Sequence, residues 1–173
     1  MDPQDAAAVE RQLGRESRGS AEVAHRCPCG EPDVVATPPR LPDGTPFPTL
    51  YYLTCPRAAA AIGTLESSGL MRDMEDRLAS DADLAAAYGA AHESFLSERA
   101  ALGERSGVGE VPEVGGISAG GMPTRVKCLH VLVAHALAAG PGVNPLGDEA
   151  LASLPEWWRP VSCADVARLE DGA

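Results

Sequence analysis

Residues 23–57 read VAHRCPCGEPDVVATPPRLPDGTPFPTLYYLTCPR and combine strand-forming runs with strong turn signals. The runs that favour strands, because they alternate or carry β-branched and aromatic side chains, are residues 21–26, 33–37 and 49–54. Pro28 and Gly30 predict a tight turn after the first run, and the Asp43-Gly44 pair among prolines predicts a longer loop after the second. We therefore expect a small three-stranded antiparallel meander.

The remainder of the chain has a mostly helical pattern. Helices are expected over residues 5–13, 56–69, 70–80, 81–102, 124–139 and 149–154. The segment 124–139 is apolar around most of its circumference, which predicts a buried central helix, and the glycine-rich residues 103–121 predict a long loop. The expected fold class is α+β, with the meander packed on a mostly helical body. We divide the chain into an N-terminal helix and connector (1–20), a single α+β domain (21–154) and a C-terminal segment (155–173).

The composition excludes some classes of function. The chain has 173 residues, of which 45% are hydrophobic and 23% charged, as in an ordinary globular protein. Its 14 Lys and Arg against 25 Asp and Glu give a net charge of −11, which disfavours nucleic-acid binding. It has no apolar run of about 18 residues, so no membrane span is expected. The start MDPQDAAAVERQ does not resemble a signal peptide, so we expect a cytoplasmic protein with reduced thiols.

Three of the five cysteines are expected to meet at one corner of the meander. Cys27 and Cys29 lie in the turn between the first two strands. If the chain reverses at Asp43-Gly44, residue 55 falls opposite about residue 32, so Cys55 lies near that turn. Zn²⁺ prefers four tetrahedral ligands and readily takes thiolates. The pattern therefore predicts a zinc site.

The fourth zinc ligand must come from elsewhere in the chain. Cys128 on the central helix is the first choice. His135, about 20° away around the same helix, is the second. Cys163 lies in a peripheral segment and is assigned no role. With four protein ligands the zinc would be structural, in a metal-stabilised binding or regulatory protein. The alternative is that the cysteines are buried structural thiols, which behave as small hydrophobic side chains.

An enzyme is a second hypothesis. A zinc ion with only three protein ligands can activate water in a hydrolase. Alternatively, Cys55 directly precedes a helix, whose N-terminus favours a reactive thiolate, and Cys128 with a nearby histidine can form a nucleophile and base pair. The spacing reveals no third residue to orient such a histidine. The catalytic residues and the substrate therefore stay undefined.

The stretch GGISAGGMPTRVKCLH (115–130) predicts an anion site. A glycine-rich segment before a helix N-terminus exposes backbone N–H groups. Arg125 and Lys127 add positive charge there, and Arg40 and His130 can join them. The ligand would be a small phosphorylated or carboxylated molecule, or an acidic segment of a protein partner. In the plainer interpretation the cations only pair with acidic side chains. A third hypothesis is a metal-free interaction scaffold that binds its partner through Trp157-Trp158.

Three long motifs carry a family resemblance. They are QLGRESRG (12–19), the run 23–57 quoted above and GMPTRVKCLHVLVAHALAAGPGVNPLGDEAL (121–151). Together they resemble a bacterial, chiefly actinobacterial, family catalogued as domain of unknown function 501, over roughly residues 9–155. The resemblance implies a small cytosolic protein and assigns no role to any residue.

Overall fold

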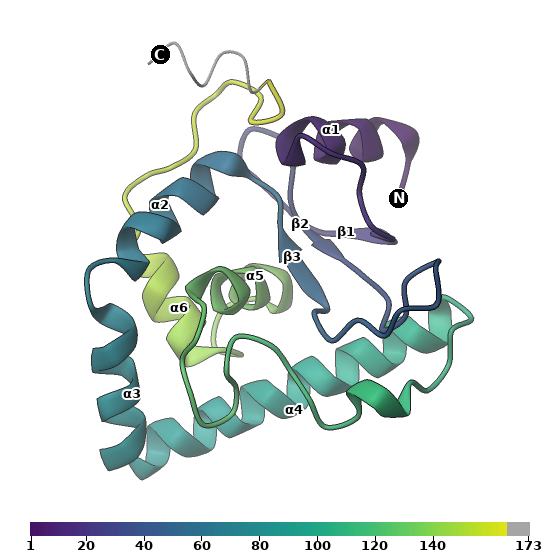
Figure 1. Ribbon diagram of the computed structural model, residues 1–173. Helices are drawn as coiled ribbons and strands as arrows, with labels where there is room; N and C mark the ends of the chain where they lie inside the picture. The colour runs from purple at the N-terminus through teal and green to yellow at the C-terminus, as the bar shows by residue number, and fades with distance from the viewer. Residues whose placement is uncertain (166–173) are drawn as a thin grey trace.

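The computed structural model describes residues 1–165 as one small sheet surrounded by helices (Figure 1). The strands are β1 (Glu22–Arg26), β2 (Pro32–Ala36) and β3 (Tyr51–Leu53). The helices are α1 (Pro3–Leu13), α2 (Pro56–Glu66), α3 (Leu70–Ser80), α4 (Ala82–Arg105), α5 (Leu129–Ala139) and α6 (Pro145–Ala152), with a 3-10 turn η1 at Pro112–Val114. The α+β class expected from the sequence is confirmed.

The three strands form the predicted antiparallel meander, in the order β1-β2-β3. Val34 pairs with Leu53, and Ala36 pairs with Tyr51. The same register, continued past the end of β3, places residue 55 opposite residue 32, as the Asp43-Gly44 reversal predicts. Every residue of β2 is buried, because this central strand is covered on both faces. The β1–β2 turn and the start of α2 consequently lie at one corner of the sheet.

Helix α5 is the buried central helix. It packs against β3 and α6 and contacts α2, while α3 and α4 pack together further out. In Figure 1, α4 runs along the lower side of the molecule, and α1 lies at the opposite end, above the sheet. The side chains of Leu129, Leu132 and Val133 are fully buried. An apolar helix with a buried circumference therefore organises the core, as its composition predicts.

Helix α5 begins at Leu129, five residues later than predicted. Residues 121–124 form a turn and residues 125–128 are irregular instead; the Arg125 N–H donates to the Gly121 carbonyl and the Lys127 N–H to the Gly120 carbonyl. The φ values of Gly120 (70°) and Gly121 (99°) lie in the left-handed region that glycine tolerates best. The prediction that Arg125 and Lys127 occupy the first helical turn is therefore wrong.

Helix α6 also begins elsewhere than predicted. Its N-cap is Asn144, whose side-chain oxygen accepts the Gly147 N–H, and Pro145 takes the first helical position. Asp148, which directly precedes the helix expected over 149–154, instead accepts the N–H of Gly142 in the preceding turn. The earlier start places Gly147 against α5, where a Cβ atom would overlap the Leu132 carbonyl oxygen.

The C-terminal segment returns across the molecule to the β1–β2 turn. The Ser162 hydroxyl donates to Glu31, and the Arg57 guanidinium donates to the Val161 carbonyl. Cys163 is completely buried there. Of the C-terminal segment predicted at 155–173, the part from residue 166 lies outside the described residues. Within residues 1–165, no helix has both the length and the apolar character needed to cross a membrane.

Candidate functional site

Four cysteines gather at the corner made by the β1–β2 turn, the start of α2 and the C-terminal segment. The sulfur atoms of Cys27, Cys29 and Cys163 lie within 4.8 Å of one another. The Cys29 and Cys163 sulfurs are 3.5 Å apart. Cys55 adjoins this trio, since its thiol interacts electrostatically with those of Cys27 and Cys163. Cys27, Cys55 and Cys163 are buried, and Cys29 is half-buried. We call these four residues the thiol cluster.

Local structure holds each part of the thiol cluster in place. The Cys27 N–H donates to the Glu31 carbonyl at 2.9 Å, and the Gly30 N–H donates to the Cys27 carbonyl at 2.8 Å. These bonds close the turn, and Gly30 has the positive φ of 94° that it requires. Cys55 is the N-cap of α2, with an extended backbone before Pro56. Each sulfur is therefore anchored to a well-defined turn, helix end or hydrogen-bonded segment.

Nearby backbone N–H groups favour the thiolate form of three of the four sulfurs: that of Cys29 acts on Cys27, those of Glu31 and Cys163 act on Cys29, and those of Ala58 and Arg57 act on Cys55. The hydrogen bond from the Cys163 thiol lowers the pKa of Cys55 to about 7, although burial opposes the shift. Burial raises the pKa of Cys27 to about 12. The hydrogen bond to Cys55, with burial, raises the pKa of Cys163. These pKa shifts favour a thiolate at Cys55 and protonated thiols at Cys27 and Cys163.

The structure brings together three of the five predicted metal ligands. Cys27, Cys29 and Cys55 meet as expected, while Cys128 and His135 lie elsewhere. The fourth thiol is Cys163, for which no role was expected. No local pattern around Cys163 could have identified it, because only the tertiary path of the C-terminal segment carries it to the turn. Gln12 of α1 supports that path by donating to both the Pro32 carbonyl and the Cys163 sulfur.

His135 is part of the hydrophobic core. Its ring stacks on Tyr51 with a centroid separation of 5.7 Å and meets Phe95 edge-on at 5.4 Å. Its Nδ1 lies 3.2 Å from the Asn144 side-chain amide. Burial lowers the pKa of His135 to about 4, so the ring is neutral at pH 7. This histidine therefore has a packing role.

Cys128 belongs to a second cluster, with Glu66 and His130. One sulfur, carboxylate oxygen and ring nitrogen from these residues lie within 4.8 Å of one another. Glu66 Oε1 accepts the Leu129 N–H at 2.7 Å and lies 3.2 Å from His130 Nδ1. His130 Nε2 lies 3.1 Å from the Ala59 carbonyl oxygen. Hydrogen bonds to the Cys128 thiol and the Glu66 carboxylate raise the pKa of His130 to about 9.

A cavity of about 600 Å³ opens beside this second cluster. Its lining is mainly apolar, with some hydroxyl and amide groups, and consists of Gln12, Leu13, Thr49, Tyr51, Tyr52, Leu53, Thr54, Pro56, Ala59, Cys128, His130 and Val131. None of these residues is a lysine, an arginine or an acid. The ring of Tyr52 is 39% exposed at this surface. The cavity therefore suits an uncharged, largely apolar group.

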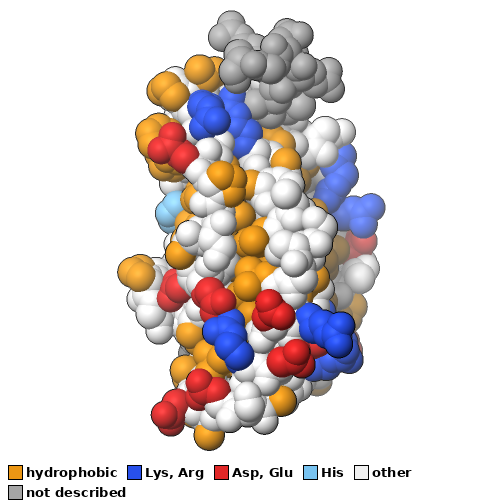
Figure 2. All heavy atoms as spheres, turned by 90° about the vertical axis from the view of Figure 1, so that its left-hand side faces the viewer, with side chains coloured by type: hydrophobic (Ala, Val, Ile, Leu, Met, Phe, Trp, Pro, Cys, Tyr) orange, Lys and Arg blue, Asp and Glu red, His pale blue; other side chains and the backbone are white. Residues whose placement is uncertain are grey.

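The cations predicted to bind an anion do not form one site. Arg40 pairs with Glu113 at 2.9 Å and also donates to the Gly44 carbonyl. Arg125 lies 3.6 Å from Glu75 on α3. Neither arginine, nor Lys127, lines the cavity beside Cys128. On the face shown in Figure 2, basic side chains are interspersed with acidic ones. This arrangement agrees with the plainer interpretation of the cations as partners of acidic side chains.

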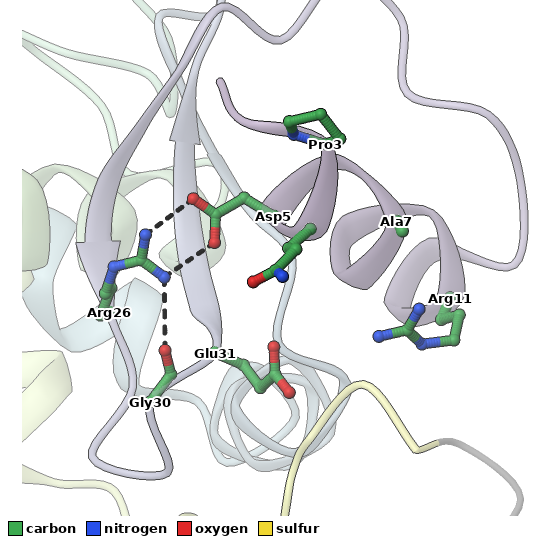
Figure 3. A pocket seen from close by; sticks show the side chains of 8 residues that line it. Pro3, Asp5, Ala7, Arg11, Arg26, Gly30 and Glu31 are labelled. Atoms are coloured by element: carbon green, nitrogen blue, oxygen red, sulfur yellow. Dashed lines mark hydrogen bonds and ion pairs between the residues drawn. The ribbon is translucent and has the colours of Figure 1, made fainter.

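A second hollow, of about 610 Å³, lies between α1 and the β1–β2 turn (Figure 3). In it the Arg26 guanidinium points at the Asp5 carboxylate and bonds both oxygens, at 2.8 and 2.7 Å. The same guanidinium donates to the Gly30 carbonyl at 3.3 Å. Because its charge is already paired, Arg26 serves as a tether that holds α1 to the turn carrying Cys27 and Cys29.

Comparison with known proteins places this fold in a family. No curated protein and no solved structure matches the chain. A family model described as "Protein of unknown function (DUF501)" matches residues 23–152. This range contains two of the three motifs that carry the resemblance, residues 23–57 and 121–151. This match spans the sheet from the second residue of β1 onward and all of α2–α6. The chain therefore belongs to the DUF501 family.

Proposed function

We propose that this chain is a zinc protein in which Cys27, Cys29, Cys55 and Cys163 hold one structural Zn²⁺. The observation that carries the proposal is the convergence of four sulfurs from three distant segments, with three of them within 4.8 Å of one another. In a tetrahedron with Zn–S bonds of about 2.3 Å, the sulfurs are about 3.8 Å apart. The 3.5 Å between the Cys29 and Cys163 sulfurs is close to that value.

The donor set and its surroundings support zinc. Thiolates are acceptors, and the backbone N–H groups near Cys27, Cys29 and Cys55 favour the thiolate form of these side chains. Such outer hydrogen bonds orient metal ligands and are a regular feature of metal sites. Four protein thiolates also fill every tetrahedral position, which is typical of structural rather than catalytic zinc.

The role of the ion follows from what it joins. It would tie the β1–β2 turn, the start of α2 and the C-terminal segment together. Helix α2 in turn supplies Pro56 and Ala59 to the wall of the cavity beside Cys128. Zinc would therefore hold the wall of a binding cavity for an uncharged small molecule. This is the metal-stabilised binding protein expected from the sequence, with a neutral ligand in place of an anionic one.

Elemental analysis of the purified full chain and its variants tests the proposal. We expect about one zinc ion per wild-type chain. Cys163→Ser should lose most of it, while Cys128→Ser, the matched control outside the thiol cluster, should keep it. Chelation should unfold the wild-type protein, as circular dichroism would record. Two results would overturn the proposal: a folded wild-type protein without metal after expression in zinc-supplemented medium, or undiminished zinc in Cys163→Ser.

A further inference from the structure

The fifth cysteine, Cys128, stands apart from the thiol cluster in a setting with different chemistry. It is the N-cap residue of α5, with an extended backbone, and its side chain makes no capping hydrogen bond. The N-terminus of a helix favours a negative charge, which a thiolate at this position would carry. Its side chain lines the cavity and is not fully buried. A substrate in the cavity can therefore reach the sulfur.

The contacts of His130 define its protonation state. Nε2 lies 3.1 Å from the Ala59 carbonyl oxygen, and Nδ1 lies 3.2 Å from Glu66 Oε1. A carbonyl and a carboxylate are both acceptors, so both ring nitrogens carry a proton and the ring is an imidazolium. A metal ion would need an unprotonated nitrogen, so this cluster is poorly arranged for a metal. A thiol beside a histidine is instead the usual arrangement of a cysteine nucleophile and its acid–base partner.

Glu66 and Ala59 hold the imidazolium in place. Glu66 is the last residue of α2, and its Oε1 bridges the Leu129 N–H and the His130 ring. The side chains of Glu66 and His130 are only 24% and 32% exposed, which restricts their movement. Helix α2 therefore positions the histidine from two sides. This is the orienting function that the sequence spacing around Cys128 does not reveal.

We propose that Cys128 is the nucleophile of an acyl-transfer site, with His130 as its acid–base partner, acting on esters or thioesters of uncharged, largely apolar acyl groups. The cavity supplies the substrate class, because its lining is apolar and hydroxyl-bearing and contains no lysine or arginine. A phosphoryl or carboxylate substrate would find no free cationic partner, because the His130 imidazolium is already paired with Glu66. The inference does not depend on zinc at the thiol cluster.

Water is the only co-reactant that the reaction needs. The Cys128 thiolate donates an electron pair to the substrate carbonyl carbon, and a C–S bond forms. The bond from that carbon to the leaving oxygen or sulfur breaks, and a His130 ring proton passes to the leaving group, which departs as an alcohol or thiol. Neutral His130 then takes a proton from water, whose oxygen attacks the thioester. Carboxylic acid is released, and the thiolate and imidazolium are restored.

The backbone around the sulfur supports this step. The N–H groups of the first turn of α5 have no carbonyl partner one turn earlier within the helix. The Leu129 N–H is taken by Glu66, so the N–H groups of His130 and Val131 are the donors to the negative oxygen that develops when the carbonyl carbon becomes tetrahedral. Val131, in this turn, also lines the cavity. Nucleophile, acid and oxyanion donors are thus all supplied within one turn of a buried helix.

The experiment uses the full zinc-loaded chain with p-nitrophenyl butyrate as the probe. We expect a burst of nitrophenolate and a butyryl adduct that peptide mass spectrometry places on Cys128. The adduct should be absent in Cys128→Ala. The acylation rate should fall by on the order of a hundredfold in His130→Gln and stay unchanged in His92→Gln, a control on α4 outside the cavity lining.

Three results would overturn the proposal. One is the lack of any burst or Cys128 adduct in folded wild-type protein. Another is an equal acylation rate in His130→Gln and wild type, which would leave Cys128 as an ordinary exposed thiol. The third is a second zinc ion per chain that disappears in Cys128→Ala, since that would make Cys128, His130 and Glu66 metal ligands. The zinc content of the thiol cluster is measured separately with Cys163→Ser. None of the three results above depends on it.

Discussion

The Asn144 side chain fixes the tautomer of His135. Its oxygen accepts the Gly147 N–H at 2.9 Å as the cap of α6, so its amide nitrogen must face His135 Nδ1, 3.2 Å away. Nδ1 therefore accepts this bond without a proton, and the ring carries its proton on Nε2. That Nε2 is buried without a hydrogen-bond partner among the described residues. A helix cap thus keeps a core histidine neutral.

This arrangement makes stability depend on pH. Burial lowers the pKa of His135 to about 4, while the Asp148 carboxylate opposes the shift. Between that value and about 6.5, the unfolded chain binds a proton that the folded protein does not. The free energy of unfolding should therefore fall as pH drops from about 6.5 to 4, by about 3 kcal/mol from this group.

Denaturant unfolding of wild type and His135→Gln across this range checks the prediction. Glutamine offers an acceptor to Asn144 but does not titrate. The variant is expected to be less stable at pH 7, with a pH slope smaller by up to about 1.4 kcal/mol per pH unit. Any loss of the proposed zinc ion in acid should affect both proteins equally. Parallel slopes would show that His135 does not carry this dependence.

Two glycines in helices should respond in opposite directions to alanine. A Cβ atom at Gly147 would overlap the Leu132 carbonyl oxygen and lie 3.0 Å from the Ala136 methyl, so Gly147→Ala should push α6 away from α5. We expect a loss of about 1–3 kcal/mol. Gly63, in α2, has open space around its Cβ position, and Gly63→Ala should stabilise the protein by about 0.5–1 kcal/mol. Thermal unfolding of the two variants measures both effects, and a shared sign would refute this account of the α5–α6 contact.

The sequence predicts those parts of the fold that short-range chemistry determines. The prolines and Asp43-Gly44 locate the reversal between β2 and β3, and the register that follows brings Cys55 to the corner carrying Cys27 and Cys29. Helix α3 has the predicted bounds, Leu70–Ser80. In these segments the turn residues and the apolar periodicity agree with the tertiary structure.

Other features depend on contacts between distant residues and leave no local signal. The Glu66 carboxylate binds the Leu129 N–H, and the turn at Gly120 and Gly121 takes the donors that an earlier start of α5 would use. Cys163 reaches the thiol cluster only because the C-terminal segment crosses back over Glu31. Cys128 and His135 share one helix face in the sequence pattern, yet the late start of α5 leaves Cys128 as its cap. The choice of fourth thiol could therefore not be predicted from spacing.

The acyl-transfer site should have an alkaline limit set by His130. Hydrogen bonds to the Cys128 thiol and the Glu66 carboxylate raise the pKa of His130 to about 9. Because the imidazolium protonates the leaving group, acylation should decline as the pH rises through about 9. Stopped-flow measurement of the nitrophenolate burst gives this profile. Glu66→Gln removes one of the two raising contacts, so its limit should move to lower pH; an unchanged limit would exclude Glu66 as a positioning residue.

In the proposed metal site, one zinc ion has four sulfur ligands at the corner of the sheet. X-ray absorption at the zinc edge of the purified full chain measures this coordination directly. For the wild type we predict a single shell of four sulfurs at about 2.3 Å. In Cys163→Ser one sulfur should be replaced by a lighter atom, or the zinc should be lost. In Cys128→Ser the shell should be unchanged. A first shell dominated by nitrogen or oxygen, or a sulfur shell that changes in Cys128→Ser and not in Cys163→Ser, would contradict the account.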